Sequence, residues 1–202
     1  METLNKQEIK EFEQREAEID SSTDEIMKSH DYRNLAMDIT GWGADAELKK
    51  LEEKAWAKKL LVKAEKFAKD YYDFKELGSF ISCGDILGEW IKEEDDNSMY
   101  EGVSISKKDK DWSRKLFKEA EKSLSKFEDR EDAAQEMIYL AAAVDQLHDY
   151  YPVFIEEDIE KDKKWALDLR ANAVKLFLKN IKVDPAKATI EQVIDAYVKL
   201  NL

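Results

Sequence analysis

Apolar residues recur along the chain at the spacing of one face of an α-helix. In three segments a tryptophan, a leucine and an alanine follow at steps of four residues, and a lysine comes two residues after the alanine. These segments begin at Trp56, Trp112 and Trp165. A step of four residues advances about 400° around a helix, so the apolar side chains form one stripe. Strands cannot use this spacing, and we expect three related helices with their tryptophans packed in the core.

A second amphipathic pattern alternates with the first. It runs from an acidic and an apolar residue, past two variable positions, to a leucine and a small residue, and ends on a β-branched residue three positions later. It begins at Asp31, Asp73 and Glu136, and a weaker copy surrounds Val193 and Tyr197. The alternation predicts an all-α fold, a single domain of antiparallel helical hairpins over residues 1–202. An α-solenoid and a compact repeat bundle both fit this pattern.

The periodicity predicts eight helices. Their expected ranges are 4–20, 24–40, 46–70, 72–92, 110–127, 130–150, 162–180 and 190–200. Residues 1–30 form an N-terminal helical segment ahead of the alternating hairpins of residues 31–202. Asp24 and Thr189 have the character of helix N-caps, the latter with Gln192 three residues on. Long connections are expected near residues 92–108 and 150–161, and regular helical repeats seldom need such lengths for packing alone.

The two alternating patterns resemble units of bacterial α-helical tandem repeats of the tetratricopeptide and Sel1-like kind. The likeness covers about residues 31 to 200. The Trp-to-Leu spacing is four here rather than three, and the glycine and tyrosine that follow in the tetratricopeptide family are absent, so its superhelix geometry is not carried over. The resemblance implies a scaffold that binds other proteins. A short, acidic, all-helical chain also resembles the bacterial immunity proteins of toxin systems, which neutralise a toxin by binding it.

Composition and charge narrow the class of protein further. The chain is 43% hydrophobic and 10% aromatic, which is enough to form a core, and only six glycines and two prolines are present to make turns between strands. The 33 basic residues against 46 acidic ones give a net charge of −13. Such a charge opposes a sequence-independent grip on nucleic acid, since like charges repel.

The sequence also bounds the compartment. The longest apolar run, residues 137–144, is far shorter than the roughly 20 residues that span a bilayer. The N-terminus lacks the basic and then apolar pattern of a secretory signal, and the single cysteine, Cys83, cannot form an internal disulfide. We therefore expect a cytoplasmic protein that does not enter the membrane. The initiator methionine and the apolar C-terminus suggest a complete small polypeptide.

The chain carries no complete signature of a catalytic or metal site. Asp145 and His148 form only half of a di-iron motif, and the chain has two histidines in all. Cys83 lacks a neighbouring histidine, and the glycines of residues 41–43 lack the lysine of a phosphate-binding loop. We expect no catalytic residue, no metal and no cofactor, and hence no enzyme. A helical enzyme with a dispersed carboxylate or metal site is the weakest alternative.

Acidic clusters beside aromatic residues, in the two long connections, are the candidate sites for binding a partner. The residues are Trp90, Glu93, Glu94, Asp95, Asp96 and Tyr100 in the first connection, and Tyr151, Phe154, Glu156, Glu157 and Asp158 in the second. Acidic charges accelerate the encounter with a partner that has a basic surface, and aromatic side chains anchor the bound partner. The simpler interpretation of each charge run is a solvated loop that aids solubility.

These observations favour a non-catalytic protein-binding module. The leading hypothesis is an acidic immunity or inhibitor protein that occludes a basic toxin such as a nuclease, whose phosphate-holding surface is positively charged. The alternative is a general helical-repeat adaptor or scaffold that holds peptides or proteins in grooves between helices. In both cases the expected partner is a protein, basic in the first case, with no direct contact to nucleic acid or membrane.

Overall fold

The computed structural model describes residues 4–41, 51–82, 87, 89–91, 102–148 and 156–201, and its fold is all-helical. The helices are α1 (Lys6–Ser21), α2 (Glu25–Thr40), α3 (Leu51–Phe67), α4 (Tyr71–Ser82), α5 (Lys107–Ser123), α6 (Arg130–Asp145), α7 (Glu156–Asn180) and α8 (Ile190–Lys199). Single 3-10 turns, Leu124–Lys126 and Gln146–His148, extend α5 and α6. Two three-residue strands, β1 (Glu89–Ile91) and β2 (Gly102–Ser104), pair antiparallel between α4 and α5.

The eight expected helices are confirmed, and their ends differ from prediction in two instructive places. The range 72–92 is wrong at its C-terminal end, because α4 ends at Ser82 and Trp90 lies in β1 opposite Val103. The connection expected at residues 150–161 is also too long, because α7 already begins at Glu156. Acidic residues in a first helical turn are favoured by the positive end of the helix dipole. Glu156, Glu157 and Asp158 therefore belong to a helix start.

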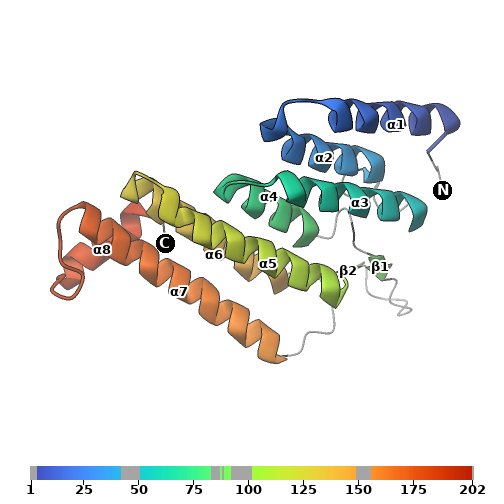
Figure 1. Cartoon of the computed structure of the whole chain (residues 1–202). Coiled ribbons are helices and arrows are strands. Elements are labelled where there is room, and N and C mark those ends of the chain that lie inside the picture. The colour runs from blue at the N-terminus through green and yellow to red at the C-terminus, as the bar shows by residue number, and fades with distance from the viewer. Residues whose placement is uncertain are drawn as a thin grey trace.

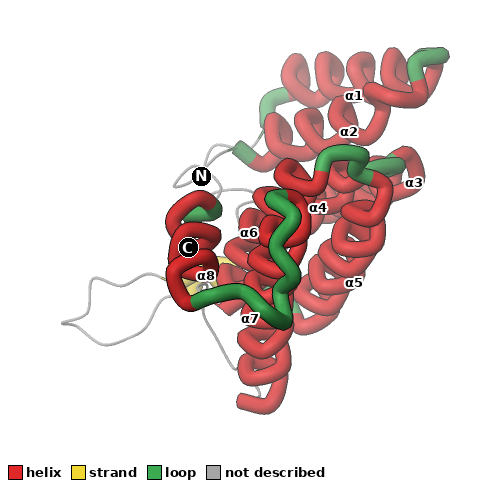
Figure 2. The backbone as a smooth tube through the Cα atoms, turned by 90° about the vertical axis from the view of Figure 1, so that its left-hand side faces the viewer, coloured by secondary structure: helices red, strands yellow, loops and turns green. Residues whose placement is uncertain are grey.

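The helices follow one another through space in the order of the chain, from α1 to α8 (Figure 1). The closest packing joins α2 to α3, α4 to α5 and α6 to α7. Within the described residues, every extensive contact joins helices that are neighbours or next neighbours in sequence. The side view shows the same succession, with α1 and α2 at one end and α7 and α8 at the other (Figure 2). The fold is thus a stack of helices whose two ends lie far apart.

The core is built from the positions that the two sequence patterns mark as apolar. The leucine and alanine of each tryptophan pattern are at most 2% exposed, and the leucine and β-branched residue of each second pattern are fully buried. The first set comprises Leu60, Ala64, Leu116, Ala120, Leu169 and Ala173, and the second comprises Leu35, Ile39, Leu77, Ile81, Leu140 and Val144. They form three successive clusters along the stack, so burial of each helix depends on its neighbours.

The three pattern tryptophans pack at the edge of the core, where each is partly buried. Each donates its indole N–H to a glutamate on the helix two positions earlier in the chain. The bonds are Trp56 Nε1 to Glu16 Oε2 at 2.7 Å, Trp112 Nε1 to Glu65 Oε2 at 2.7 Å and Trp165 Nε1 to Glu121 Oε2 at 2.9 Å. Glu65 and Glu121 each lie nine residues after the tryptophan of their own pattern. The same contact therefore recurs from α1 through α3 and α5 to α7.

We expect this recurring bond to couple neighbouring helices measurably. In a double-mutant cycle of Trp112→Phe and Glu65→Ala, the coupling free energy should be about 1 kcal/mol. A hydrogen bond to a charged carboxylate is stronger than one between two neutral groups. Urea unfolding of the four proteins measures it. Strictly additive effects of the two substitutions would show that the bond contributes nothing to stability.

No helix in the described part of the chain combines the length and the apolar character needed to cross a membrane.

Candidate functional site

The structure brings few of the predicted site residues together. Glu93, Glu94, Asp95, Asp96, Tyr100, Tyr151 and Phe154 lie outside the described residues. Trp90 lies in β1, and Glu156 and Glu157 form the first turn of α7. Asp158 lies beside the start of α5, with its Oδ2 3.8 Å from Lys107 Nζ. The one acidic side chain of these clusters that the structure describes is thus paired with a lysine of the protein itself.

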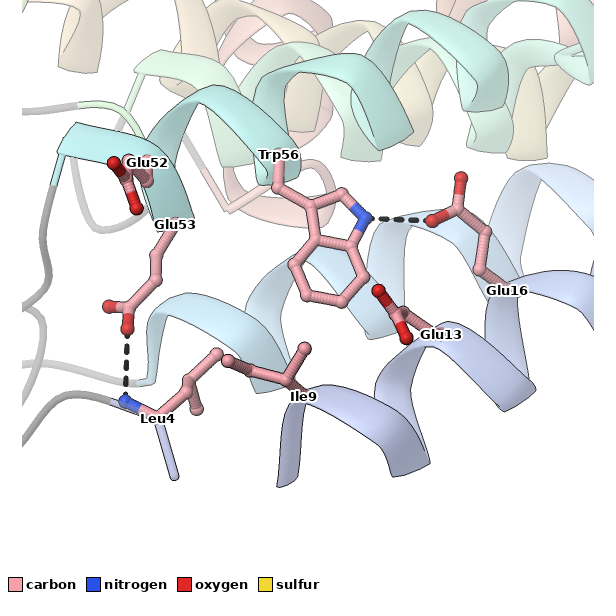
Figure 3. Close-up of a pocket in the computed structure, with 7 residues that line it drawn as sticks. All are labelled: Leu4, Ile9, Glu13, Glu16, Glu52, Glu53 and Trp56. Carbon is pink, nitrogen blue, oxygen red and sulfur yellow. Dashed lines mark hydrogen bonds between the residues drawn. The ribbon is translucent and has the colours of Figure 1, made fainter. Parts of the chain in front are cut away.

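A different acidic site is formed between α1 and α3. It is a pocket of about 350 Å³, which we call the α1–α3 pocket. Its lining residues are Leu4, Ile9, Glu13, Glu16, Glu52, Glu53 and Trp56. Figure 3 shows the Trp56 ring between the glutamates of α1 on one side and those of α3 on the other. The pocket therefore combines an aromatic and aliphatic surface with four carboxyl groups.

Two of the four glutamates are engaged within the protein. Glu16 accepts the indole N–H of Trp56 at 2.7 Å and a hydrogen bond from Lys63 Nζ at 2.8 Å. Glu53 is buried, and its Oε1 accepts the backbone N–H of Leu4 at 3.1 Å (Figure 3). These bonds fix the N-terminal end of α1 and the Trp56 ring in place.

A charged network behind the pocket holds α1 against α2 and α3. Lys63 Nζ bonds Asp20 as well as Glu16, and the Tyr32 hydroxyl donates to Asp20 Oδ1 at 2.5 Å. The hydrogen bonds from Lys63 and Tyr32 lower the pKa of Asp20. Burial, followed by the Asp20 bond, raises the pKa of Tyr32 to about 12. Burial opposes the charge of Lys63, but its bonds to Asp20 and Glu16 outweigh burial and raise its pKa. The network is charged at neutral pH.

The other two glutamates of the pocket are uncommitted. Glu13 and Glu52 are exposed, and neither has a hydrogen bond or an ion pair with any of the residues that the structure describes. Carboxylates on two walls of one pocket repel each other and are stabilised by a cation placed between them. The Trp56 face next to them favours a cation as well. The pocket is suited to a positively charged group attached to an apolar stem.

The geometry does not favour metal chemistry at this pocket. Within the described residues, no group of three or more histidine, cysteine, aspartate or glutamate side chains is arranged to hold a metal ion. Two smaller hollows elsewhere on the stack are lined in part by residues that bond to the protein itself. In one of them Tyr71 donates its hydroxyl to the Glu136 carbonyl at 2.7 Å, and burial raises the pKa of Tyr71.

Sequence reasoning missed the α1–α3 pocket because its two halves are far apart in the chain. Glu13 and Glu16 are separated from Glu52 and Glu53 by more than thirty residues, and they meet only through the packing of α1 on α3. A local signal exists for the α1 half, since Glu13 and Glu16 are three residues apart and therefore share a helix face.

Comparison with known proteins adds no relative. No protein-family model matches the chain, and neither the curated proteins nor the solved structures include a significant match. The resemblance to tetratricopeptide and Sel1-like repeats stays a prediction, and any function has to be argued from the geometry.

Proposed function

We propose that this chain is a non-catalytic protein-binding module that holds a basic side chain of a partner protein in the α1–α3 pocket. The observation that carries the proposal is the pair of uncommitted carboxylates, Glu13 and Glu52, on the walls of a preformed pocket beside Trp56. A lysine or arginine side chain matches all three features. Its stem packs on apolar surface and its charged end meets the carboxylates.

The overall charge supports the same kind of partner. A protein with a net charge of −13 attracts a basic surface over distances of about a Debye length and accelerates encounter. The most specific form of the proposal is an immunity or inhibitor protein that neutralises a basic toxin such as a nuclease. The phosphate-holding surface of a nuclease is basic, and an acidic ligand would compete with nucleic acid for it.

The first test is direct binding to the full chain. The probe is a fluorescently labelled peptide of alternating glycine and arginine, measured by anisotropy at low and moderate salt. We expect Glu13→Gln combined with Glu52→Gln to weaken binding about ten-fold, the equivalent of roughly 1.4 kcal/mol, because both carboxylates of the pocket lose their charge. The two side chains are exposed, so stability should not change.

The matched control removes the same charge from the same protein outside the pocket. Glu11→Gln combined with Glu18→Gln alters two exposed glutamates of α1 that do not line it. This control should bind the peptide nearly as well as the unchanged protein. Equal losses in the two double variants would mean that the peptide senses net charge alone, and the pocket would then be rejected.

Capture of the natural partner tests the more specific form. The tagged protein is used as bait in its native host, with elution by increasing salt and identification by mass spectrometry. One basic protein, absent when the bait carries Glu13→Gln and Glu52→Gln, would support neutralisation and provide the target for a nuclease-inhibition assay. Several unrelated proteins retained at high salt would favour a general adaptor.

A further inference from the structure

The last helix of the stack has two apolar faces. The inner face of α8 packs on α6 and α7, with Ala196 fully buried, Leu200 1% exposed and Val193 partly buried. The helix start is fixed by a reciprocal pair of hydrogen bonds between Thr189 and Gln192. The buried side chains attach α8 to the stack, and the capping bonds fix the residue at which the helix begins. The side chains on its outer face therefore have set positions on the surface of the protein.

The outer face of α8 is apolar and exposed. Ile190 is 81% exposed, Ile194 56%, Tyr197 44% and Val198 67%. Residues spaced by three and four positions lie on one strip of a helix, so these side chains form a continuous surface that we call the α8 stripe. Exposed apolar residues are ordinary when scattered, but the terminal helix of a stack normally presents a polar outer face to remain soluble. The α8 stripe is the surface on which one more helix would pack.

The charge beside the stripe selects among possible occupants. Glu191 and Asp195 are exposed and lie on the next strip of the same helix, at about 100° of rotation per residue, with the exposed Lys199 one turn further on, so this edge carries two carboxylates and one ammonium group. A second copy of the chain would bring another −13 charges to this surface, and that repulsion opposes self-association. An amphipathic helix with lysine or arginine along its edge would instead face the two carboxylates with opposite charge.

We propose that the α8 stripe docks an amphipathic helix of another protein, one whose apolar face covers Ile190, Ile194 and Val198 and whose edge is basic. Helix-in-groove recognition works by the same pairing of an apolar face with flanking charges. The helix that carries the stripe, α8, lies at the opposite end of the stack from α1 (Figure 1). This second surface is independent of the proposed pocket, and each stands without the other.

A designed helix serves as the probe. Two labelled peptides of about 18 residues, long enough to form a helix on binding, carry leucines at helical spacing and either lysine or glutamate at all other positions. Binding to the full chain is measured by anisotropy. We expect the leucine–lysine helix to bind at least about ten-fold more tightly than the leucine–glutamate helix. Ile194→Asn combined with Val198→Asn should reduce its affinity by about the same factor.

The control is an aliphatic side chain of similar exposure away from the stripe. Leu167 on α7 is 63% exposed, and Leu167→Asn should leave the affinity unchanged. Circular dichroism and thermal unfolding of each variant confirm that the fold is retained. Glu11→Gln with Glu18→Gln removes two charges that lie outside both surfaces and should also leave this affinity nearly unchanged, which separates binding at the α8 stripe from attraction by net charge.

Two outcomes would overturn the proposal. If the stripe variant binds the leucine–lysine helix as well as the unchanged protein, the peptide is attracted by net charge alone. If sedimentation shows a dimer that dissociates on Ile194→Asn, the occupant of the stripe is a second copy.

Discussion

Alanine at Gly78 is expected to lower the free energy of unfolding by about 3 kcal/mol, although alanine is the better helix former. A Cβ at Gly78 would lie 2.6 Å from Cε1 and 2.8 Å from Cδ1 of Phe117, closer than carbon atoms normally approach. Phe117 is fully buried, so its ring cannot move away without disturbing the core. The Gly78 carbonyl also accepts a 2.6 Å hydrogen bond from Ser113 Oγ on the same face of α5. Overpacking and displacement of this bond should outweigh the roughly 1 kcal/mol gained in helix propensity.

The sequence offers matched controls for this substitution. Ala36 and Ala141 occupy the position of Gly78 in the related helices α2 and α6, and both are fully buried. Ala141→Gly should lower the free energy of unfolding by about 1 kcal/mol through the poorer helix propensity of glycine, and the loss of a small buried methyl group should add to this. In a Phe117→Leu background the Gly78→Ala change should become close to neutral. Urea unfolding measures the stability of each variant. If Gly78→Ala alone were as stable as the unchanged protein, α4 and α5 would be able to move apart without any loss of free energy of unfolding.

The eight helices were predictable because their signal is local and repeated. Leu77 and Ile81 are fully buried, as the repeated pattern predicts. The small residue at Gly78 could be recognised from its counterparts Ala36 and Ala141. The reason why this residue has to be small could not be recognised, because it is the close approach of Phe117, which lies 39 positions further along the chain.

The β1–β2 pair was missed for a specific reason. The repeated apolar pattern of this helix ends at Ile81, and the predicted range of residues 72–92 continues past it into residues that the pattern does not cover. The strand is stabilised instead by pairing Glu89 with Ser104, fifteen residues away. A segment of three residues is too short to show a sequence pattern that would indicate non-local pairing of this kind.

The candidate site was harder to predict than the fold. The Glu156–Asp158 run falls within the predicted connection of residues 150–161, although acidic residues before an amphipathic pattern also suit a first helical turn. The α1–α3 pocket has no continuous motif, because its carboxylates come from two helices that become neighbours only in the stack. The recurring glutamate nine residues after Trp56 and Trp112 was a usable signal for contact between these helices.

A buried lysine gives the second large effect, which depends on pH. Lys110 is 5% exposed and donates a hydrogen bond from its Nζ to the Leu147 carbonyl at 3.0 Å, which joins α5 to the end of α6. Burial, and after it the nearby charge of Arg114, lower the pKa of Lys110 from 10.5 to about 8, with Asp162 partly offsetting both. A charged lysine is therefore less stable in the folded state than in the unfolded chain.

The sign of the pH dependence follows from proton binding. Below about pH 8 both states hold the proton, and the folded state carries the full cost of the buried charge. Between about pH 8 and 10.5 the unfolded state binds more protons, so the contribution of Lys110 to stability rises with pH. The shift corresponds to about 3 kcal/mol over that window.

Two reference variants isolate this contribution from the other groups that titrate at alkaline pH. Lys110→Met is neutral and Lys110→Arg is charged throughout the window, so neither titrates at this position. Urea unfolding between pH 7 and 10.5 should show the unchanged protein gaining about 3 kcal/mol relative to each of them, with the same midpoint in both comparisons. A difference that stays constant with pH would mean that Lys110 keeps its ordinary affinity for protons despite its burial. Because Lys110 bonds the Leu147 carbonyl in the 3-10 turn that follows α6, the gain should be accompanied by stronger protection of α5 and α6 from amide hydrogen exchange than of α1.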